Sequence, residues 1–412
     1  MTTTLRNNAW LIWFIAALFY GVEFFQRVAP SVISQDIVAT FHITETSLGF
    51  IISLYYYAYA VAQIPVGLTL DRFGARTPLA IAAFAVSLGT LLFAHTDNLI
   101  ILSLARIIVG IGSAFAFVGC LKLAKDWFTG RQFAFIVGLT NTIGVLGALF
   151  GETPLNSLVH RIGWQLSLLF TAIAGFIVCA LILVFVRNAP NEQIKMVPLP
   201  IKTTLLQIIK SSQSWLIGLY AGLMVAPVIA YAELWSNAFL EIVHHINSTE
   251  ATFATTLIFV GIAVGGPTNG FLSSILNRRK LILLIGNVMA LALLTTIILV
   301  PQLSFLALCI ALFFFGFFTS SMLVAFPLNT EQHPSTISAT VIAFTNMLIM
   351  IIGALFQPTI GYLLDFLSAG SHHHLLTSAE FRQALWCLPI ALAINLIILC
   401  FIRESHCKNL CK

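Results

Sequence analysis

Charged residues are scarce in this chain of 412 residues. Only 8% are Asp, Glu, Lys or Arg and 59% are hydrophobic, whereas an ordinary soluble domain is about 25% charged. So few charges cannot cover a soluble surface of this size, and lipid must be the solvent for most of the chain. The net charge of +5 comes from basic residues scattered singly between apolar runs, which excludes a basic patch and predicts no nucleic-acid partner.

Signatures of catalysis and of cofactor binding are missing too. The chain has no G-x-x-x-x-G-K-[ST] segment, which argues against an ATP-driven pump, and no nucleophile–base constellation of a membrane enzyme. Its 7 cysteines have no metal-ligand spacing and indicate no disulfide framework. We expect a protein that is not an enzyme, holds no cofactor or metal and functions as a monomer. Its expected partners are a small-molecule substrate, protons and the lipid bilayer.

Long apolar runs dominate the sequence instead. A spanning helix needs about 20 mostly apolar residues, and its backbone polar groups must be satisfied within the segment. Such runs occur at residues 9–30, 47–68, 78–95, 98–121, 132–153, 164–187, 214–239, 252–272, 281–300, 303–327, 337–361 and 383–402. The first run is too long for a cleavable signal peptide. The sequence therefore predicts an all-α membrane protein with twelve transmembrane helices.

The distribution of basic residues predicts the orientation. With a cytoplasmic N-terminus, only Arg161 and Arg382 of the 20 Lys and Arg residues fall on the outer side. Only Arg27 and Arg106 fall within the membrane, and all the others lie at the inner ends and loops. This is the bias of the positive-inside rule. We expect both termini to be cytoplasmic, in a multi-pass protein of a bacterial inner membrane.

The chain has the pattern of a duplicated six-helix unit. A polar, proline-containing connection predicts an N-terminal bundle, a cytoplasmic linker and a C-terminal bundle with a short tail, at 1–187, 188–213 and 214–412. The stretch Thr140-Asn141, then Gly147-Ala-Leu-Phe150, recurs about 205 residues later as Thr345-Asn346, then Gly353-Ala-Leu-Phe356. Repeated halves that rock about a midplane site are the architecture of secondary transporters.

A charged turn follows the second apolar run. It reads Pro65-Val-Gly67-Leu-Thr-Leu-Asp71-Arg72-Phe-Gly74-Ala-Arg76-Thr77. Its glycines allow close helix approach and a tight turn, and an acid there can pair with a neighbouring helix end and hold an inner gate shut. The alternative is a plain positive-inside loop. We expect the inner gate to consist of Gly67, Asp71, Arg72, Gly74 and Arg76.

This segment resembles the loop 2–3 signature of the major facilitator superfamily, G-x-x-x-D-R-x-G-R-R in outline. The chain departs from it at Ala75, where the family has a basic residue. Two more segments resemble family signatures, Arg106-Ile-Ile-Val-Gly110-Ile-Gly112 and Asp126-Trp-Phe-Thr-Gly-Arg131. The counterpart loop after the eighth run keeps Gly270 and Arg279 but has Ser274 and Asn277. The resemblance covers the whole chain and implies two pseudo-symmetric six-helix bundles.

A narrower resemblance lies in the first two runs. The segments Phe19-Tyr-Gly-Val-Glu23-Phe-Phe-Gln-Arg27-Val-Ala-Pro-Ser31 and Ser53-Leu-Tyr-Tyr-Tyr-Ala-Tyr59-Ala-Val-Ala-Gln63-Ile-Pro65-Val-Gly67 are similar to the proteobacterial phagosomal amino-acid transporter (Pht) family. That resemblance implies uptake of amino acids or related small nutrients, together with protons.

Charged residues within the apolar runs mark candidate functional positions, because burying them in a membrane is costly. They are Glu23, Arg27, Arg106, Glu152 and Glu233. Glu23 and Arg27 are four residues apart and can pair on one helix face. In the superfamily the helices that carry Glu23, Arg106 and Glu233 line a central cavity, so the resemblance implies one polar chamber. The alternative is a set of structural ion pairs that hold helices together.

These charges suggest a division of roles. We expect Arg106, together with Arg27, to receive a substrate carboxylate, because a guanidinium binds it in a bidentate way and stays charged. Glu23 or Glu233 is expected to carry the coupling proton.

Tyrosines on the second run extend the candidate site. Tyr56, Tyr59 and Gln63 follow the i, i+3, i+7 spacing of one helix face. We expect them to line the substrate cavity, the alternative being interfacial or packing residues.

Three functions fit these residues. The first is a secondary active transporter that takes up amino acids or related nutrients with protons by alternating access, since a zwitterion needs both a cation and an acid. The second is an organic-anion or drug antiporter of the same superfamily, favoured if Glu23 is buried against Arg27 and Arg106 is left as the lone free charge. The third is a non-transporting membrane sensor of the solute, which would normally carry a further soluble domain.

Overall fold

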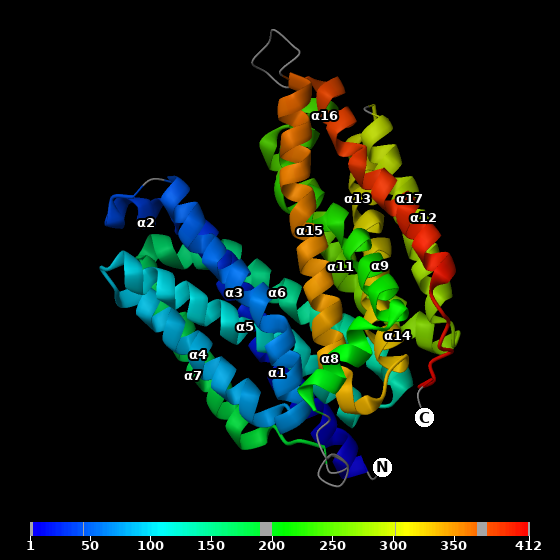
Figure 1. Cartoon of the computed structure of the whole chain (residues 1–412). Coiled ribbons are helices and arrows are strands. Elements are labelled where there is room, and N and C mark those ends of the chain that lie inside the picture. The colour runs from blue at the N-terminus through cyan, green and yellow to red at the C-terminus, as the bar shows by residue number, and fades with distance from the viewer. Residues whose placement is uncertain (1–2, 44, 190–199, 301, 369–376, 411–412) are drawn as a thin grey trace. The chain divides into compact units, whose positions relative to one another are not determined.

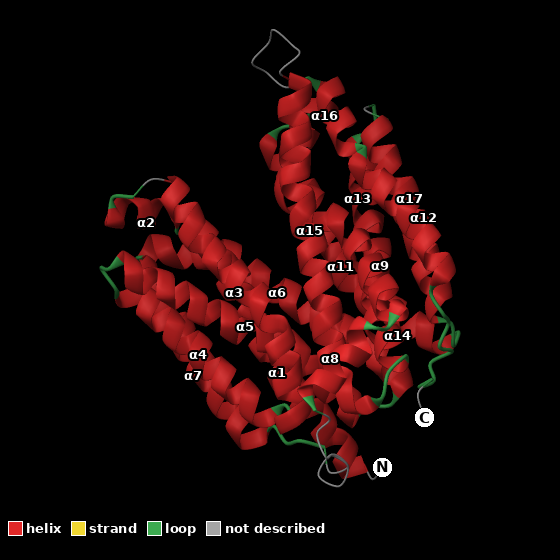
Figure 2. Cartoon of the chain, in the orientation of Figure 1, coloured by secondary structure: helices red, strands yellow, loops and turns green. Residues whose placement is uncertain are grey.

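The computed structural model describes residues 1–412 except 1–2, 44, 190–199, 301, 369–376 and 411–412 (Figure 1). The described chain consists of helices joined by loops, with no strand among its elements (Figure 2). The elements are α1 (Thr3–Val32), α2 (Ser34–Phe41), α3 (Glu45–Phe73), α4 (Arg76–His95), α5 (Leu99–Trp127), α6 (Gly130–Ile162), α7 (Trp164–Phe185), α8 (Ile201–Ile209), α9 (Ser212–Pro227), η1 (Val228–Trp235), α10 (Ser236–His244), α11 (Ser248–Ile275), α12 (Arg279–Leu299), α13 (Phe305–Thr319), η2 (Ser320–Val324), α14 (Ala325–Glu331), η3 (Ser335–Ile337), α15 (Ser338–Ser368), α16 (Ser378–Leu385) and α17 (Cys387–Phe401).

Twelve helical segments of the described chain are long and apolar enough to cross a membrane. They are Ala9–Pro30, Phe50–Phe73, Arg76–His95, Leu99–Trp127, Gly130–Ile162, Trp164–Phe185, Ser212–His244, Ser248–Ile275, Arg279–Leu299, Phe305–Glu331, Ser335–Leu364 and Ser378–Phe401. Each overlaps one of the apolar runs read from the sequence. The predicted all-α class and the predicted number of spans are confirmed.

Some spans are interrupted helices, and the interruptions follow from local sequence. The seventh span changes to the π-helix η1 directly after Pro227, whose ring nitrogen cannot donate a helical hydrogen bond. The twelfth span breaks at Trp386, between α16 and α17. Pro389 lies in the first turn of α17, and it cannot donate to the carbonyl of Leu385 at the end of α16. A π-helical turn inside a helix often accompanies a functional site.

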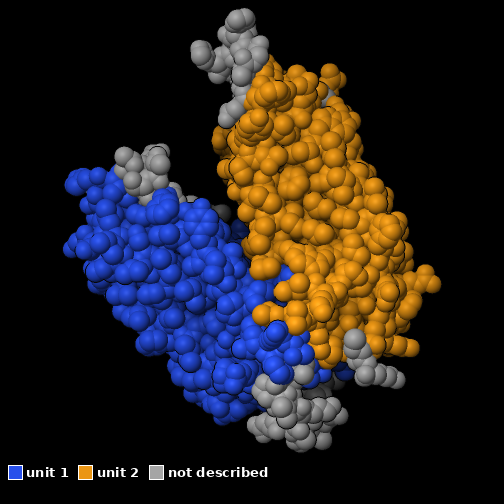
Figure 3. Space-filling view, viewed as in Figure 1, with its two compact units in different colours: residues 1–129, 140–204, 335–344 blue, residues 130–139, 205–334, 345–412 orange. Residues whose placement is uncertain are grey.

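The chain divides into two compact units (Figure 3). Unit 1 comprises residues 1–129, 140–204 and 335–344, and unit 2 comprises residues 130–139, 205–334 and 345–412. Helices α6 and α15 therefore each contribute residues to both units. The bundles and linker expected from the sequence remain a prediction, and residues 190–199 of that linker lie outside the described residues.

Unit 1 is built around α5. Helices α1, α3 and α4 pack against it, and α7 packs against α1 and α4. A glycine permits the close approach of α3 to α5: a Cβ on Gly110 would lie 2.4 Å from the backbone oxygen of Tyr55. Small residues at helix interfaces let two backbones come together in this way. The α3–α5 contact fixes the region that carries the candidate site.

Unit 2 packs α11 and α12 against α13, and α17 against α9 and α12. Buried polar side chains add hydrogen bonds across these helices. Asn395 Nδ2 on α17 donates to the Tyr220 carbonyl on α9 at 3.0 Å, and the Tyr220 hydroxyl donates to the Leu283 carbonyl on α12 at 2.7 Å. In an apolar environment such interhelical hydrogen bonds set the orientation of helices whose surfaces are hydrophobic on every side.

The internal repeat extends to details of the two charged turns. Gly74 has a φ of +71°, and its counterpart Asn277 has a φ of +52°. Asparagine is one of the few residues besides glycine that adopt this left-handed conformation readily. The helix after each turn begins with a backbone N–H bonded to a side chain: Asn188 Oδ1 accepts from Arg76 N at 3.1 Å, and Glu404 Oε1 accepts from Arg279 N at 3.0 Å. Glycine at position 74 and asparagine at position 277 thus support the same kind of turn.

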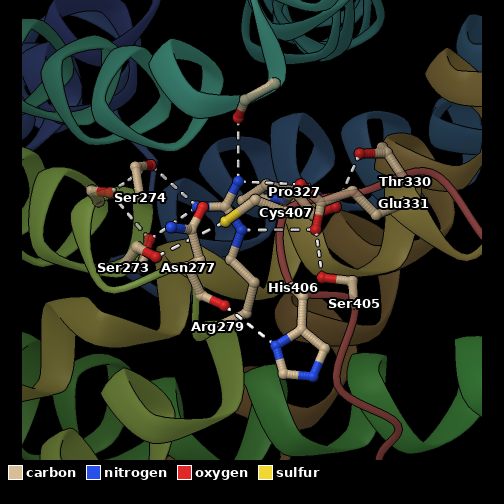
Figure 4. Close-up of polar contacts among 12 residues, drawn as sticks. Ser273, Ser274, Asn277, Arg279, Pro327, Thr330, Glu331, Ser405, His406 and Cys407 are labelled. Carbon is tan, nitrogen blue, oxygen red and sulfur yellow. Dashed lines mark hydrogen bonds and ion pairs between the residues drawn. The ribbon is translucent and has the colours of Figure 1, made fainter.

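Arg279 is the centre of a buried polar network in unit 2 (Figure 4). Its guanidinium pairs with Glu331 Oε1 at 2.9 Å and donates to Ser273 Oγ at 2.8 Å and to the Gly130 carbonyl at 2.9 Å. The chain after α17 completes the network, because Ser405 Oγ donates to Glu331 Oε2 at 2.5 Å. Ser405 of this segment is therefore buried and belongs to the polar network of unit 2.

Candidate solute site

Glu23 and Arg27 form an ion pair on α1, in which Glu23 is buried and Arg27 is partly buried. Glu23 has no exposed surface, and its Oε1 lies 3.6 Å from Nε of Arg27, one helical turn away. The Tyr55 hydroxyl on α3 donates a hydrogen bond to the same Glu23 oxygen. The other oxygen, Oε2, has no hydrogen-bond partner among the described residues. One oxygen of the Glu23 carboxylate thus interacts with Arg27 and Tyr55, and the other accepts no hydrogen bond from the described residues.

Aromatic rings surround the Arg27 guanidinium. Its Cζ lies 4.7 Å from the centre of the Phe24 ring, 5.5 Å from Tyr59 and 5.8 Å from Tyr56. Rings at these distances attract a cation through their negative faces. Together with Glu23, they hold Arg27 in place and offset the cost of placing its charge in the membrane.

Arg106 on α5 is held differently. Its side chain is 3% exposed, and no acidic side chain of the described residues forms an ion pair with it. Its Nη1 donates one long bond of 3.4 Å to the Gln26 carbonyl, and its Nε and Nη2 have no partner there. The guanidinium lies 5.0 Å from the centre of the Tyr55 ring. It is a buried cation with two donors available.

A small cavity adjoins Arg106. Its lining includes Gln26, Thr90 and Arg106, and its volume is about 10 Å³. That is room for roughly one water molecule, so in this structure the cavity accommodates a single small group at the guanidinium.

The tyrosines and glutamine of α3 divide between buried and exposed positions. Tyr59 is 3% exposed and Gln63 is fully buried, while Tyr56 is 45% exposed and lies at the edge of the cluster. Both amide atoms of Gln63 lack a hydrogen-bond partner among the described residues. Since a buried amide without partners costs free energy, Gln63 is a candidate to bind a polar group of a solute.

The remaining charged candidates lie elsewhere. Glu233 belongs to unit 2, where its exposed side chain lies on the π-helix η1. The side chain of Glu152 lies outside the described residues. In unit 1 the structure therefore brings together Glu23, Arg27 and Arg106.

Asp71 contacts the first turn of α15. Its Oδ1 accepts from Ala339 N at 3.0 Å, and its Oδ2 accepts from Thr340 N at 2.8 Å and from the Thr340 hydroxyl at 2.7 Å. A carboxylate at a helix N-terminus satisfies free N–H groups and interacts well with the helix dipole. Lys122 Nζ lies 3.8 Å from Oδ1 and balances its charge.

The other members of the charged turn differ in what they contact. Gly67 lies so close to α15 that an added Cβ would be 2.6 Å from the Thr340 Cα. Arg76 Nη2 donates to the Leu183 carbonyl at 2.7 Å. Arg72 is exposed and stacks over the neighbouring Phe73 ring at 5.5 Å. The contact with α15 is therefore made by Asp71 and Gly67, whereas the two arginines lie beside it.

Sequence reasoning did not assign a role to Tyr55 or Lys122. Tyr55 belongs to the tyrosine run of α3, but the spacing test selected Tyr56 and Tyr59. Lys122 is 1% exposed and also pairs with Asp126 at 3.3 Å, four residues later on α5. The i, i+4 spacing of Lys122 and Asp126 in an apolar helix is the sequence feature that could have marked Lys122 as a candidate.

Twelve apolar helices, buried charges on several of them and an internal repeat define a multi-pass membrane carrier. The chain belongs to the Major Facilitator Superfamily, whose family model matches residues 10–244 and 229–409. This confirms the superfamily resemblance read from the charged turn. The curated relatives and the solved structures that resemble the chain are named as transporters.

Curated relatives match parts of the chain. An uncharacterized transporter, YybO of Bacillus subtilis, is 32% identical over 38% of this chain and 37% of its own length. The probable galactarate/D-glucarate transporter GudP of Escherichia coli is 24% identical over 66% of this chain and 68% of its own. The D-galactonate transporter of Escherichia coli is 27% identical over 61% and 64%. The chain spans about two fifths of the length of the first relatives it matches.

Solved structures share the fold. The fucose:proton symporter FucP of Escherichia coli aligns with a TM-score of 0.69 and 17% identity, over 94% of this chain and 98% of that one. The proton:xylose symporter XylE aligns with a TM-score of 0.70 and 17% identity, over 98% of both chains. At this identity the likeness concerns the fold alone.

Proposed function

We propose that this chain takes up a small organic anion, of the sugar-acid class, together with a proton. The observation that carries the proposal is the state of the two arginines within the spans of unit 1, the partly buried Arg27 and the buried Arg106. Glu23 is buried against Arg27, and Arg106 is left without an acidic partner among the described residues. This is the arrangement that favours an anion over a zwitterion, because the acid that would bind an ammonium group is already paired.

Arg106 suits a carboxylate in geometry as well as in charge. Its Nε and one terminal nitrogen, Nη2, are the two guanidinium atoms without a hydrogen-bond partner in the part of the chain that the structure describes. Adjacent guanidinium donors match the two oxygens of a carboxylate in a bidentate pair. The Gln63 amide offers a donor and an acceptor that bond to none of the described residues, which suits a hydroxyl group of the same solute. Arg27 lies beside this set and would reinforce its positive potential.

The relatives support an anionic substrate. Their names specify galactarate or D-glucarate, hexuronate, D-galactonate and sulfoacetate, all of which carry a carboxylate or sulfonate. An amino acid is the competing substrate, for two reasons: the first two spans resemble the Pht family, and Glu23 Oε2 has no partner among the described residues.

Glu23 is the candidate proton carrier within unit 1, and Glu233 is the candidate within unit 2. An anion that arrives with one proton brings a small net charge into the membrane, and bare charge is penalised there. We propose an orientation with both termini in the cytoplasm, as the basic residues suggest, and a location in the bacterial inner membrane, as the bacterial relatives suggest. Asp71 and its contact with α15 would form the inner gate of the alternating-access cycle.

Uptake into proteoliposomes, with and without an imposed pH gradient, tests the proposal. Labelled D-galactonate and D-glucuronate should accumulate when the outside is acidic, and an equimolar amino-acid mixture should not compete. Accumulation of an amino acid without any sugar acid would overturn the anion assignment and favour the competing substrate.

Variants of Arg106 and Glu23 test the roles proposed for these two residues. Arg106→Lys should weaken substrate binding about tenfold or more although the charge is kept, because the bidentate pair is lost. Glu23→Gln should abolish accumulation driven by protons yet spare exchange of labelled for unlabelled substrate. If Arg106→Ala binds substrate as tightly as the parent, the arginine is structural.

A further inference from the structure

Tyr55 contacts both the candidate anion-binding group and the candidate proton carrier. Its ring faces the Arg106 guanidinium at 5.0 Å, and its hydroxyl donates to Glu23 Oε1. Arg106 and Glu23 form no ion pair with each other in the described structure. The side chain of Tyr55 is therefore a shared neighbour of two charged groups that come from α5 and α1.

The position of Tyr55 is fixed on several sides. The side chain is completely buried. Tyr59 stacks on its ring at 6.0 Å with 23° between the planes, and Tyr56 meets it edge-on at 5.1 Å. Its backbone carbonyl lies against Gly110, where an added Cβ would be 2.4 Å away. Because the ring is held in place, a change of charge over its face can alter the donor strength of its hydroxyl without any movement of the side chain.

We propose that Tyr55 couples binding of the anion at Arg106 to protonation of Glu23. This inference rests on the proposed function and names the residue by which its two sites communicate. Tyr55 acts through Glu23 and is thus a positioning residue, which keeps its own proton throughout the cycle.

The physical reason lies in the phenol. A cation over the ring face draws electron density from the ring and makes the hydroxyl a stronger donor, and a strong donor favours the charged form of the carboxylate that accepts it. When a substrate carboxylate pairs with Arg106, the positive charge near the ring is neutralised. The hydroxyl then donates less strongly, and Glu23 takes one proton from the aqueous phase. One anion and one proton are bound together.

The other charged or titratable groups near Glu23 do not take up a proton at neutral pH. The titratable or charged groups that interact with it are Arg27 and Tyr20 on its own helix and Tyr55 on α3, while Tyr59 and Arg106 contact the Tyr55 ring. Tyrosine and arginine side chains ordinarily titrate far above neutral pH. Glu23 is accordingly the group whose proton the pH profile of transport would report.

Tyr55→Phe is the direct test, because it keeps the ring over Arg106 and removes only the hydroxyl. Exchange of labelled for unlabelled D-galactonate should stay within about twofold of the parent. Accumulation driven by a pH gradient should fall about tenfold. The pH at which substrate binding is half-maximal should move upward by roughly one to two units, as expected for the loss of a hydrogen bond to a charged group.

Replacement of Tyr55 by 3,5-difluorotyrosine provides a second variant with the hydroxyl and the ring retained. Its more acidic hydroxyl is a stronger donor, so the pH profile should move downward, opposite to the effect of Tyr55→Phe. Tyr57→Phe is the matched control: it makes the same chemical change on the same helix, at a residue that is 62% exposed. It should leave exchange, accumulation and the pH profile unchanged.

The outcomes separate this inference from the proposed function. If the parent protein neither exchanges nor accumulates any sugar acid, the proposed function fails. If the parent accumulates D-galactonate and Tyr55→Phe has the same pH profile, the coupling role of Tyr55 is wrong. A parallel loss of exchange, accumulation and thermal stability in both Tyr55 variants would show that the residue only supports the fold, and would also overturn the inference.

Discussion

Asp71→Asn is the most direct test of the contact between α3 and α15. The carboxylate accepts three hydrogen bonds of 2.7–3.0 Å from Ala339 and Thr340. An asparagine has only one acceptor oxygen, so at least one of the two backbone N–H groups would face an NH₂ group instead. The substitution also removes the negative charge at the N-terminus of α15 and one of the two acidic partners of Lys122.

The expected magnitude follows from these bonds. A hydrogen bond to a charged group contributes about 1.5–3 kcal/mol, so the loss of one or two amounts to about 3 kcal/mol. Since 1.36 kcal/mol corresponds to a factor of ten, the equilibrium between conformers with and without the contact should shift roughly a hundredfold. The chain can relax into the conformer without the contact instead of unfolding, so the melting temperature should change little.

Initial rates of D-galactonate uptake into proteoliposomes measure the effect, and melting of the purified protein measures the folding. We expect uptake by Asp71→Asn to be at least about tenfold slower. Thr340→Val removes only the 2.7 Å hydroxyl bond and should give a smaller reduction. An unchanged uptake rate in Asp71→Asn, or a larger effect in Thr340→Val, would refute a gating role for this contact.

Three further predictions concern stability and topology. Arg279→Ala should lower the free energy of unfolding by about 3–5 kcal/mol, because Glu331 would be left buried without its partner; a melting temperature equal to that of the parent contradicts this. Burial lowers the pKa of His333 below its ordinary value of 6.5, so the folded protein binds fewer protons than the unfolded chain as the pH falls below about 6.5. Thermal stability should therefore decline with falling pH over that range, and His333→Gln should flatten the profile; an equally steep decline in the variant assigns the effect to another group. In a cysteine-free background, Lys202→Cys should react with an impermeant thiol reagent only from the cytoplasmic side and Asp97→Cys only from outside, and the reverse pattern would overturn the orientation.

The sequence alone determined the number of spans and the tight turn at Gly74. Twelve apolar runs predict twelve helices because hydrocarbon leaves the backbone few alternatives to helix formation. Gly74 predicted a tight turn since its left-handed φ is a local property of the backbone. The Glu23–Arg27 pair was predictable for the same reason, because its i, i+4 spacing lies within a single helix.

Contacts between distant segments were decided only by the tertiary structure. The backbone donors to Asp71 are 268 and 269 residues away along the chain, and no spacing rule connects them. Tyr55 and Tyr56 are adjacent and identical in type, yet one is buried against Glu23 and the other is 45% exposed. The energy of a buried charge depends on what lies within a few ångströms of it across neighbouring helices. That distance is set by how the helices pack, which is why the free donors of Arg106 and the role of Tyr55 emerge only from the fold.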